Sequence, residues 1–205
     1  MASRSSLSKK RVAREAAVLL YTSQEKEYKQ AKSRAAQTLG ARVLPSNFEV
    51  AKELDNIAEE REGRSRQERL LRMRREALQI MEFLKKFHPK LIGSVWRGTA
   101  HKNSDIDIVT FSSEPKTVLS QLHKSNFKIV KTEWLSVTKR GRKEESFHIH
   151  LILPSGNEVE VVVRNPERIE VKERCEIYGD FMTGLSYPQL KRVLEENPLQ
   201  KFVPT

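Results

Sequence analysis

The sequence of 205 residues predicts an α+β fold in which an N-terminal helical region precedes a mixed β-sheet domain with flanking helices. Two observations predict this fold. Up to about residue 88 the apolar residues recur at helical spacing, as Val12, Ala16 and Leu19 do. Beyond residue 90 apolar and polar residues alternate, as they do in strands whose side chains point to opposite faces in turn. Helices followed by several strands are typical of α+β domains.

Four helices are expected before the sheet, and start or stop signals bound them. The third begins after Ser46 or Asn47, which are favoured N-cap residues, with Glu49 in its first turn. It ends near Gly63, because glycine is favoured just beyond a helix C-terminus. The expected helices are 10–21, 23–39, 47–63 and 66–87.

The alternation then predicts four strands, with one helix between the first two and another near the C-terminus. The expected strands are 105–111, 127–137, 146–153 and 158–163, and the helices are 115–125 and 187–196. We therefore expect a helical region at 1–88, a sheet core at 89–165 and a C-terminal extension packed on that core at 166–205.

The charge is concentrated in the first part of the chain. Of the net charge of +11, about +9 lies in residues 1–90, which hold 21 Lys and Arg against 12 Asp and Glu. A basic region favours contact with a polyanion such as RNA, although a solvated helix face with paired glutamates explains the same residues. The predicted nucleic-acid contacts are Arg66, Arg69, Arg72 and Arg75 on the fourth helix, with Arg140, Arg142 and Lys143 at a hairpin tip.

The composition argues against membrane insertion and secretion. The chain has no apolar run of eighteen residues, its N-terminus lacks an apolar signal core, and Cys175 is its one cysteine. We therefore expect a cytoplasmic protein without a disulfide or a cysteine-based zinc site.

Two aspartates at the start of the first expected strand are the leading candidates for chemistry. Asp105 and Asp107 flank Ile106, so their side chains project from the same face of that strand. Two such carboxylates repel each other unless a cation lies between them. A solvated acidic strand end would have the same sequence, so the pair needs support from other residues.

That support comes from a Gly-Ser pair and from further charged residues. Gly93 allows a close approach of the backbone to a ligand, and Ser94 offers a hydroxyl to a phosphate oxygen. Arg97 and Lys102 follow, so positive charge is available for a triphosphate. We therefore predict that Gly93, Ser94, Arg97 and Lys102 bind a nucleotide.

A third carboxylate is expected from the last strand of the sheet. Glu160 shares one face with Glu158, while the valines between and after them point to the other face. Three carboxylates on a sheet suit two Mg²⁺ ions, with Mn²⁺ as a possible substitute. His148 and His150 alternate on the neighbouring strand and either contact the substrate, tune these carboxylates or simply lie on the exposed sheet face.

These motifs together resemble those of the DNA polymerase β-like nucleotidyltransferase superfamily. The run GSVWRGTAHKNSDIDI is similar to its Gly-Ser and Asp-x-Asp signature, with the spacing of the minimal nucleotidyltransferases, and its later part resembles archaeal CCA-adding enzymes. The resemblance covers about residues 90–165 and implies that Asp105, Asp107 and Glu160 are catalytic metal ligands. The family usually has aspartate at the third position, where this chain has Glu160, and Glu158 is the alternative ligand.

The resemblance implies transfer of a nucleoside monophosphate from an NTP, with ATP or CTP favoured, to an acceptor hydroxyl with release of pyrophosphate. The 3′ end of a tRNA-like RNA is the expected acceptor. Two alternatives stay open: adenylylation of a protein, as in toxin–antitoxin members of the superfamily, and a nucleotide- or RNA-binding module without turnover.

Overall fold

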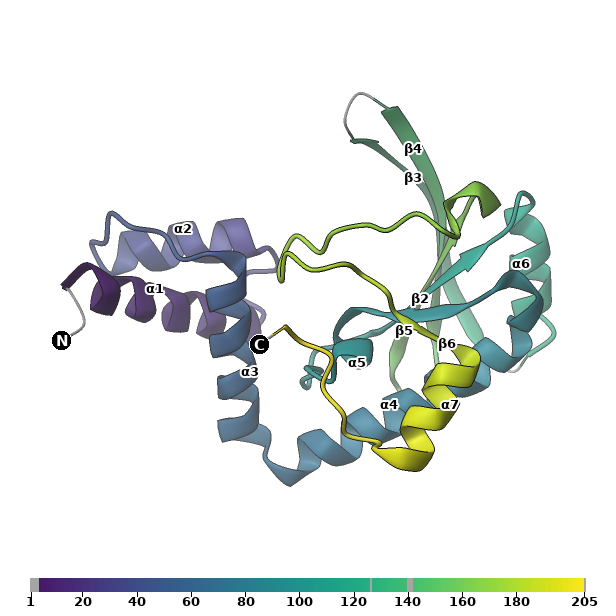
Figure 1. Cartoon of the computed structure of the whole chain (residues 1–205), viewed down its shortest axis with the longest axis horizontal. Coiled ribbons are helices and arrows are strands. Elements are labelled where there is room, and N and C mark those ends of the chain that lie inside the picture. The colour runs from purple at the N-terminus through teal and green to yellow at the C-terminus, as the bar shows by residue number, and fades with distance from the viewer. Residues whose placement is uncertain (1–3, 126, 140–141, 205) are drawn as a thin grey trace.

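The computed structural model describes residues 4–125, 127–139 and 142–204, and it confirms an α+β fold with helices ahead of a mixed sheet (Figure 1). The helices in this part of the chain are α1 (Arg4–Tyr21), α2 (Tyr28–Thr38), α3 (Asn47–Glu62), α4 (Arg64–Phe83), α5 (Gly93–Arg97), α6 (Pro115–Leu122) and α7 (Tyr187–Glu196). The strands are β1 (Lys90–Ile92), β2 (Ile106–Phe111), β3 (Lys128–Lys139), β4 (Arg142–Ile152), β5 (Glu158–Arg164) and β6 (Leu185–Ser186), and two short 3₁₀ helices are η1 (Lys85–Phe87) and η2 (Pro166–Arg168).

Helices α1, α2 and α3 form a small bundle with its own apolar core. Alanines on α1 and α2 line this core, so the helix backbones approach each other closely, and Val50 and Ile57 of α3 complete it. Ser46 is the N-cap of α3: its hydroxyl accepts from the Glu49 N–H at 3.1 Å, and the Glu49 carboxylate accepts from the Ser46 N–H at 2.7 Å. The predicted start of this helix is therefore confirmed.

Helix α2 begins at Tyr28, later than expected. Residues 22–27 form a loop instead, in which Ser23 has a positive φ of 56°. The backbone N–H groups of Gln24 and Glu25 both donate to the Leu19 carbonyl at the end of α1. This closing turn separates the two helices, and its position matters for the site described below.

Helix α4 packs with the sheet rather than with the first three helices. Its buried residues Leu70, Met73 and Ile80 share one apolar cluster with the strands and with α6 and α7. The apolar cores thus divide the chain near Gly63. The expected division at residues 88 and 165 stays a prediction.

The sheet has the strand order β3-β4-β5-β2-β1-β6 in the described residues. Its neighbours are antiparallel except β2 and β5, which run parallel and bring Asp107 opposite Glu160. Strand β1 pairs with β2 so that Ile92 lies opposite Asp107. The Gly-Ser pair therefore begins directly beside the second aspartate. Neither β1 nor β6 was expected, because each is too short to show an alternation.

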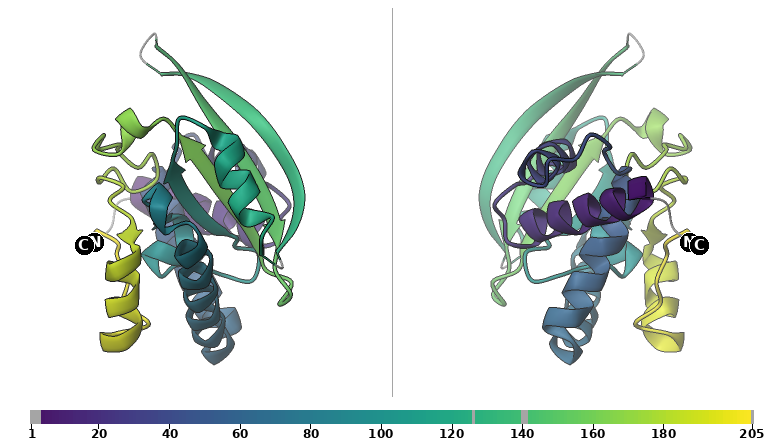
Figure 2. Two further views of the ribbon diagram at one scale, coloured as in Figure 1. Left: turned by 90° about the vertical axis from the view of Figure 1, so that its right-hand side faces the viewer. Right: turned by 90° about the vertical axis from the view of Figure 1, so that its left-hand side faces the viewer.

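The C-terminal segment returns to the junction between the α1–α3 bundle and the sheet domain (Figures 1 and 2). Arg74 of α4 is fully buried and holds it there. The Arg74 guanidinium donates to the carbonyls of Val95 and Trp96 on α5, and to those of Pro198 and Gln200 in the tail. Helices long and apolar enough to span a membrane are absent from the described residues.

Candidate active site

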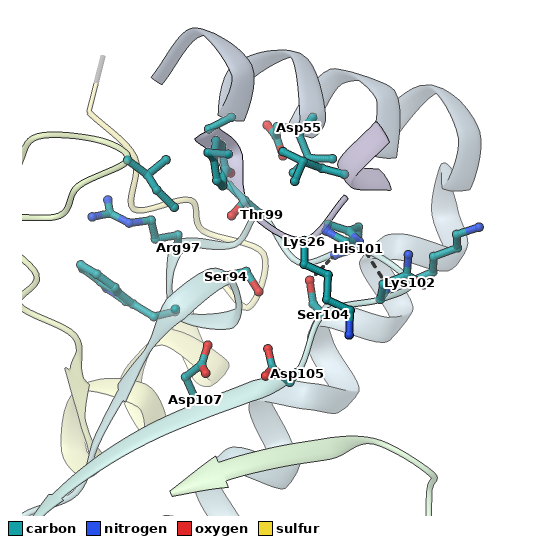
Figure 3. A pocket seen from close by; sticks show the side chains of 18 of the residues that line it. Lys26, Asp55, Ser94, Arg97, Thr99, His101, Lys102, Ser104, Asp105 and Asp107 are labelled. Atoms are coloured by element: carbon teal, nitrogen blue, oxygen red, sulfur yellow. Dashed lines mark hydrogen bonds between the residues drawn. The ribbon is translucent and has the colours of Figure 1, made fainter. Parts of the chain in front are cut away.

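The acidic pair lies at the start of β2, at the edge of a large pocket. Asp105 immediately precedes the strand and Asp107 is its second residue, so both carboxylates leave the same face. Figure 3 shows them pointing into the same space as the Ser94 hydroxyl. The pair and the serine thus converge, as the sequence predicted.

Gly93 is required at this position for two reasons. Its φ is +70°, a conformation that other residues rarely adopt, and a Cβ on it would overlap the Asp107 carboxylate. The Asp107 side chain therefore packs directly against the backbone at the start of α5. Because Gly93 has no side chain, the first turn of α5 and the Asp107 carboxylate can approach each other.

Both aspartates are held in an environment that disfavours their charge. Burial raises the pKa of Asp107 well above its usual value of 3.8, and the nearby charges of Asp105 and Glu160 raise it further. The pKa of Asp105 is also raised, first by the surrounding protein atoms and then by Glu160 and Glu158, although its own backbone N–H offsets part of this. Across residues 4–125, 127–139 and 142–204 no lysine or arginine forms an ion pair with either carboxylate. The charge of the pair is therefore not offset by a lysine or arginine ion pair in the described residues.

Glu160 lies on the neighbouring strand, in register with Asp107. Its carboxylate is hydrogen-bonded to His148 Nδ1 at 2.7 Å, and His148 Nε2 lies 2.8 Å from the Ser146 hydroxyl. His150 Nε2 is 3.9 Å from Glu160 and 3.1 Å from Glu133. Both histidines thus lie beside the third carboxylate, and their expected roles toward substrate or carboxylates stay predictions.

The three carboxylates are not assembled as a metal cage. In the described part of the chain, no three His, Cys, Asp or Glu side chains are grouped so that they could hold one ion. Glu160 leaves the same face of the sheet as Asp107, but its carboxylate is hydrogen-bonded to His148. Asp105 and Asp107 form the paired site, and Glu160 as a metal ligand stays a prediction.

Arg97 forms an ion pair with Asp180. Its guanidinium donates to both carboxylate oxygens of Asp180, at 3.0 and 2.7 Å, and to the Phe202 carbonyl at 2.9 Å. Only 4% of its side chain is exposed, and it stacks over Tyr178. In this arrangement the Arg97 charge is paired with Asp180, and its triphosphate contact stays a prediction. Arg97 ties α5 to the C-terminal loop.

The loop that precedes the acidic pair is fixed to the helical bundle. The Asn103 side-chain amide donates to the Tyr21 carbonyl and to the Ser23 hydroxyl, both at 2.9 Å. The Lys102 N–H donates to the Glu62 carboxylate at the end of α3, at 3.0 Å. The Lys102 ammonium lies over the Tyr21 ring, 4.8 Å from its centroid. The predicted nucleotide contact of Lys102 stays a prediction, and its backbone has a structural role that sequence reasoning did not find.

The pocket has a volume of about 930 Å³ and lies between the bundle and the sheet domain. Its floor carries Ser94, Asp105 and Asp107, and Figure 3 places Asp55 of α3 on the opposite side. Apolar side chains line the part formed by the bundle and the C-terminal loop, namely Leu20, Tyr28, Ala51, Leu54, Ile177, Tyr178 and Met182. One end of the pocket is thus acidic and another largely apolar, and both halves of the chain contribute walls.

The arginines of α4 separate into buried and exposed groups. Arg66 is buried and pairs with Asp55 and Glu59, and its nucleic-acid contact stays a prediction. Arg69 is half-buried and pairs with Glu62, whereas Arg72 and Arg75 are exposed. Of the predicted hairpin contacts, Arg140 lies outside the described residues, and for Arg142 and Lys143 the structure describes the backbone of β4 but not the side chains.

Four residues around the site were not singled out from the sequence. Asn103 and Asp180 hold the loops, Tyr178 lines the apolar part, and Lys26 extends from the α1–α2 loop into the pocket toward the acidic pair (Figure 3). The contacts of Asn103 and Asp180 join residues about 80 positions apart, and Lys26 stands in a loop without a motif. No pattern local to the sequence identifies such residues.

One family profile and several solved structures match this chain. The chain matches the sequence profile of the nucleotidyltransferase domain over residues 74–179, more than half of its length. No curated protein matches it. Solved structures with a similar fold include the Cid1 poly(U) polymerase (21% identity, 48% of this chain, 32% of that chain, TM-score 0.34), a cytoplasmic RNA terminal U-transferase (18%, 58%, 35%, 0.36) and the GLD-2/RNP-8 complex (14%, 61%, 45%, 0.35).

This chain spans about a third of the length of the first two of these proteins. The profile match covers the Gly-Ser turn, both aspartates and Glu160. The chain therefore belongs to the nucleotidyltransferase domain family.

Proposed function

We propose that the protein transfers a nucleoside monophosphate from an NTP to an acceptor hydroxyl, with the 3′ end of an RNA as the acceptor and pyrophosphate as the second product. One observation carries the proposal: two carboxylates with raised pKa values converge with Ser94 at the end of a pocket of about 930 Å³. An acidic pair whose pKa values are raised, without a protein cation beside it, is costly to a fold, and such cost is characteristic of functional sites.

The donor set fits Mg²⁺. Asp105 and Asp107 offer hard carboxylate oxygens, and the described residues supply no cation that would compete for them. We propose that these two residues hold two Mg²⁺ ions, with Mn²⁺ as a substitute, and that Glu160 completes the set. When bound, such ions offset phosphate charge and lower the pKa of an attacking hydroxyl.

The chain's own residues would then orient the donor and the acceptor. The Ser94 hydroxyl has no hydrogen-bond partner in the described residues and is free to donate to a phosphate oxygen. Gly93 allows the phosphates to approach the backbone. Glu160, held by His148, would position the acceptor side of the site.

An RNA acceptor is supported by the basic first half of the chain and by the exposed arginines Arg72 and Arg75 on α4. The likeness of residues 98–108 to archaeal CCA-adding enzymes supports ATP or CTP as the donor. Asp55 and the bundle lie across the pocket from the acidic pair, so the nucleotide base of the NTP would contact the bundle.

Incubation with each of the four NTPs, labelled on the α-phosphate, in the presence of Mg²⁺ tests the proposal. A pool of small RNAs and a protein extract free of RNA are offered separately as acceptors. Label from ATP or CTP at RNA 3′ ends is the expected result. Label found only on protein would identify a protein nucleotidyltransferase, and label from UTP or GTP alone would contradict the proposed donor.

A further inference from the structure

Among the described residues, the sheet-domain side of the pocket has no lysine or arginine that is without a partner. Phosphates of an NTP carry several negative charges, and proteins usually meet them with lysine or arginine. Among the described residues the pocket is lined by three such side chains, those of Lys26, Arg97 and Lys102. Arg97 is neutralised by Asp180, and the Lys102 ammonium lies over the Tyr21 ring.

Lys26 differs from these two. It lies in the loop between α1 and α2, its side chain is exposed, and the described residues provide it with no ion pair or hydrogen bond. Glu25, the neighbouring acid that also lines the pocket, pairs with Arg34 at 3.0 Å and is therefore not its partner. Figure 3 shows Lys26 reaching down from the bundle in the direction of Ser104 and Asp105.

The loop that carries Lys26 is held in place from both sides. Its first residues cap α1 through hydrogen bonds to the Val18 and Leu19 carbonyls. From the other side, Asn103 donates to the Tyr21 carbonyl and to Ser23, at 2.9 Å each. Because Asn103 stands two residues before Asp105, the same contact fixes the lysine loop and the acidic pair relative to each other.

We propose that Lys26 binds the phosphates of the NTP and that the α1–α3 bundle thereby forms half of the nucleotide site. This inference rests on the proposed function. The triphosphate lies between Lys26, Ser94 and the acidic end of the pocket. The base extends to the apolar part, where Tyr28 and Leu54 of the bundle face the C-terminal loop with Ile177 and Tyr178. The bundle is thus a part of substrate binding and not only a support for the acceptor.

Calorimetric titration of the full chain with ATP, CTP and their nucleosides, in the presence of Mg²⁺, tests this assignment. Lys26→Gln should weaken NTP binding by roughly ten- to a hundredfold, because it removes a charge-assisted contact. Nucleoside binding should change by less than about twofold, because nucleosides have no phosphate for Lys26 to meet. Lys26→Arg, which keeps the charge, should retain NTP binding to within about threefold.

Lys29→Gln is the matched control. Lys29 is an exposed lysine on α2 that does not line the pocket, so this variant removes the same charge from the same bundle and should bind NTP normally. Equal NTP affinity of Lys26→Gln and the parent protein would overturn the inference and leave the proposed function intact. Equal losses for NTP and nucleoside, or a loss in Lys26→Arg as large as in Lys26→Gln, would also overturn it. A parent protein that binds no NTP would overturn both.

Discussion

Gly93 and Asp107 are packed so closely that a methyl group on the glycine would overlap the aspartate carboxylate. The contact joins the first turn of α5 to the second residue of β2, and the pairing of Ile92 with Asp107 sets it. It explains why a glycine precedes the serine, since only this residue leaves room for the acid and adopts a φ of +70°.

Gly93→Ala should therefore be destabilising and inactive. Strain at positive φ costs about 1–2 kcal/mol, and the overlap with Asp107 should raise the loss of unfolding free energy to about 3 kcal/mol or more. Gly40→Ala is the control, because Gly40 has a φ of +60° and no atom within 4 Å of an added Cβ. Urea denaturation of both variants measures the difference, and equal losses would show that the contact with Asp107 contributes nothing.

The acidic pair should make stability depend on pH. Folding raises the pKa of both aspartates, so between the usual value of 3.8 and the raised values the folded state binds more protons than the unfolded state. The stabilising contribution of these two groups is therefore complete below about pH 4 and is lost as pH rises through the raised pKa values.

Asp107→Asn removes this dependence. In buffer with a chelator, the variant should gain unfolding free energy relative to the parent protein as pH rises from about 4.5 to 7.5, and the two should converge at the acidic end. Mg²⁺ should reduce the gap at neutral pH, because a bound cation relieves the repulsion. A difference that is independent of pH would contradict the raised pKa.

Asp180→Ala should destabilise the protein by about 1–3 kcal/mol, because it leaves the buried Arg97 guanidinium without its counter-ion. The loss is limited because Asp180 itself is partly solvated. NTP affinity, measured below the unfolding transition, should stay within about threefold of the parent value. Normal stability combined with a large loss of NTP affinity would instead return Arg97 to the role of a phosphate ligand.

Arg74→Met should release the C-terminal segment. The buried guanidinium, whose pKa is lowered by burial to about 10, donates to four carbonyls, two of them in the tail. Loss of these four hydrogen bonds should reduce the unfolding free energy by about 3 kcal/mol or more and expose residues 197–204 to proteolysis. Arg75→Met, on the exposed side of the same helix, should change stability by less than about 0.5 kcal/mol. An intact tail in Arg74→Met would contradict this role.

Much of the architecture could be predicted from the sequence because it depends on local periodicity and on capping. Ser46 and Glu49 mark the start of α3, and the helix expected at 187–196 is observed as α7. The acidic pair could also be predicted, since alternation along one strand determines which side chains share a face.

The electrostatic roles could not be predicted in the same way. Of the arginines expected to meet phosphates, Arg66 and Arg97 are buried and paired with acids on other elements, whereas Arg72 is exposed. Periodicity places each on a helix but does not reveal the acid that neutralises it. Lys26 could not be identified from the sequence either, because only the tertiary contact through Asn103 brings its loop over the site.

The central claim is that Asp105 and Asp107 form the catalytic acidic pair. The most direct measurement is the rate at which the double variant Asp105→Asn, Asp107→Asn moves α-labelled nucleotide from NTP to RNA in Mg²⁺, with its melting temperature recorded alongside. We predict a fall of roughly a thousandfold or more, together with a melting temperature at least equal to that of the parent protein without metal. Undiminished transfer by the folded double variant would contradict the claim.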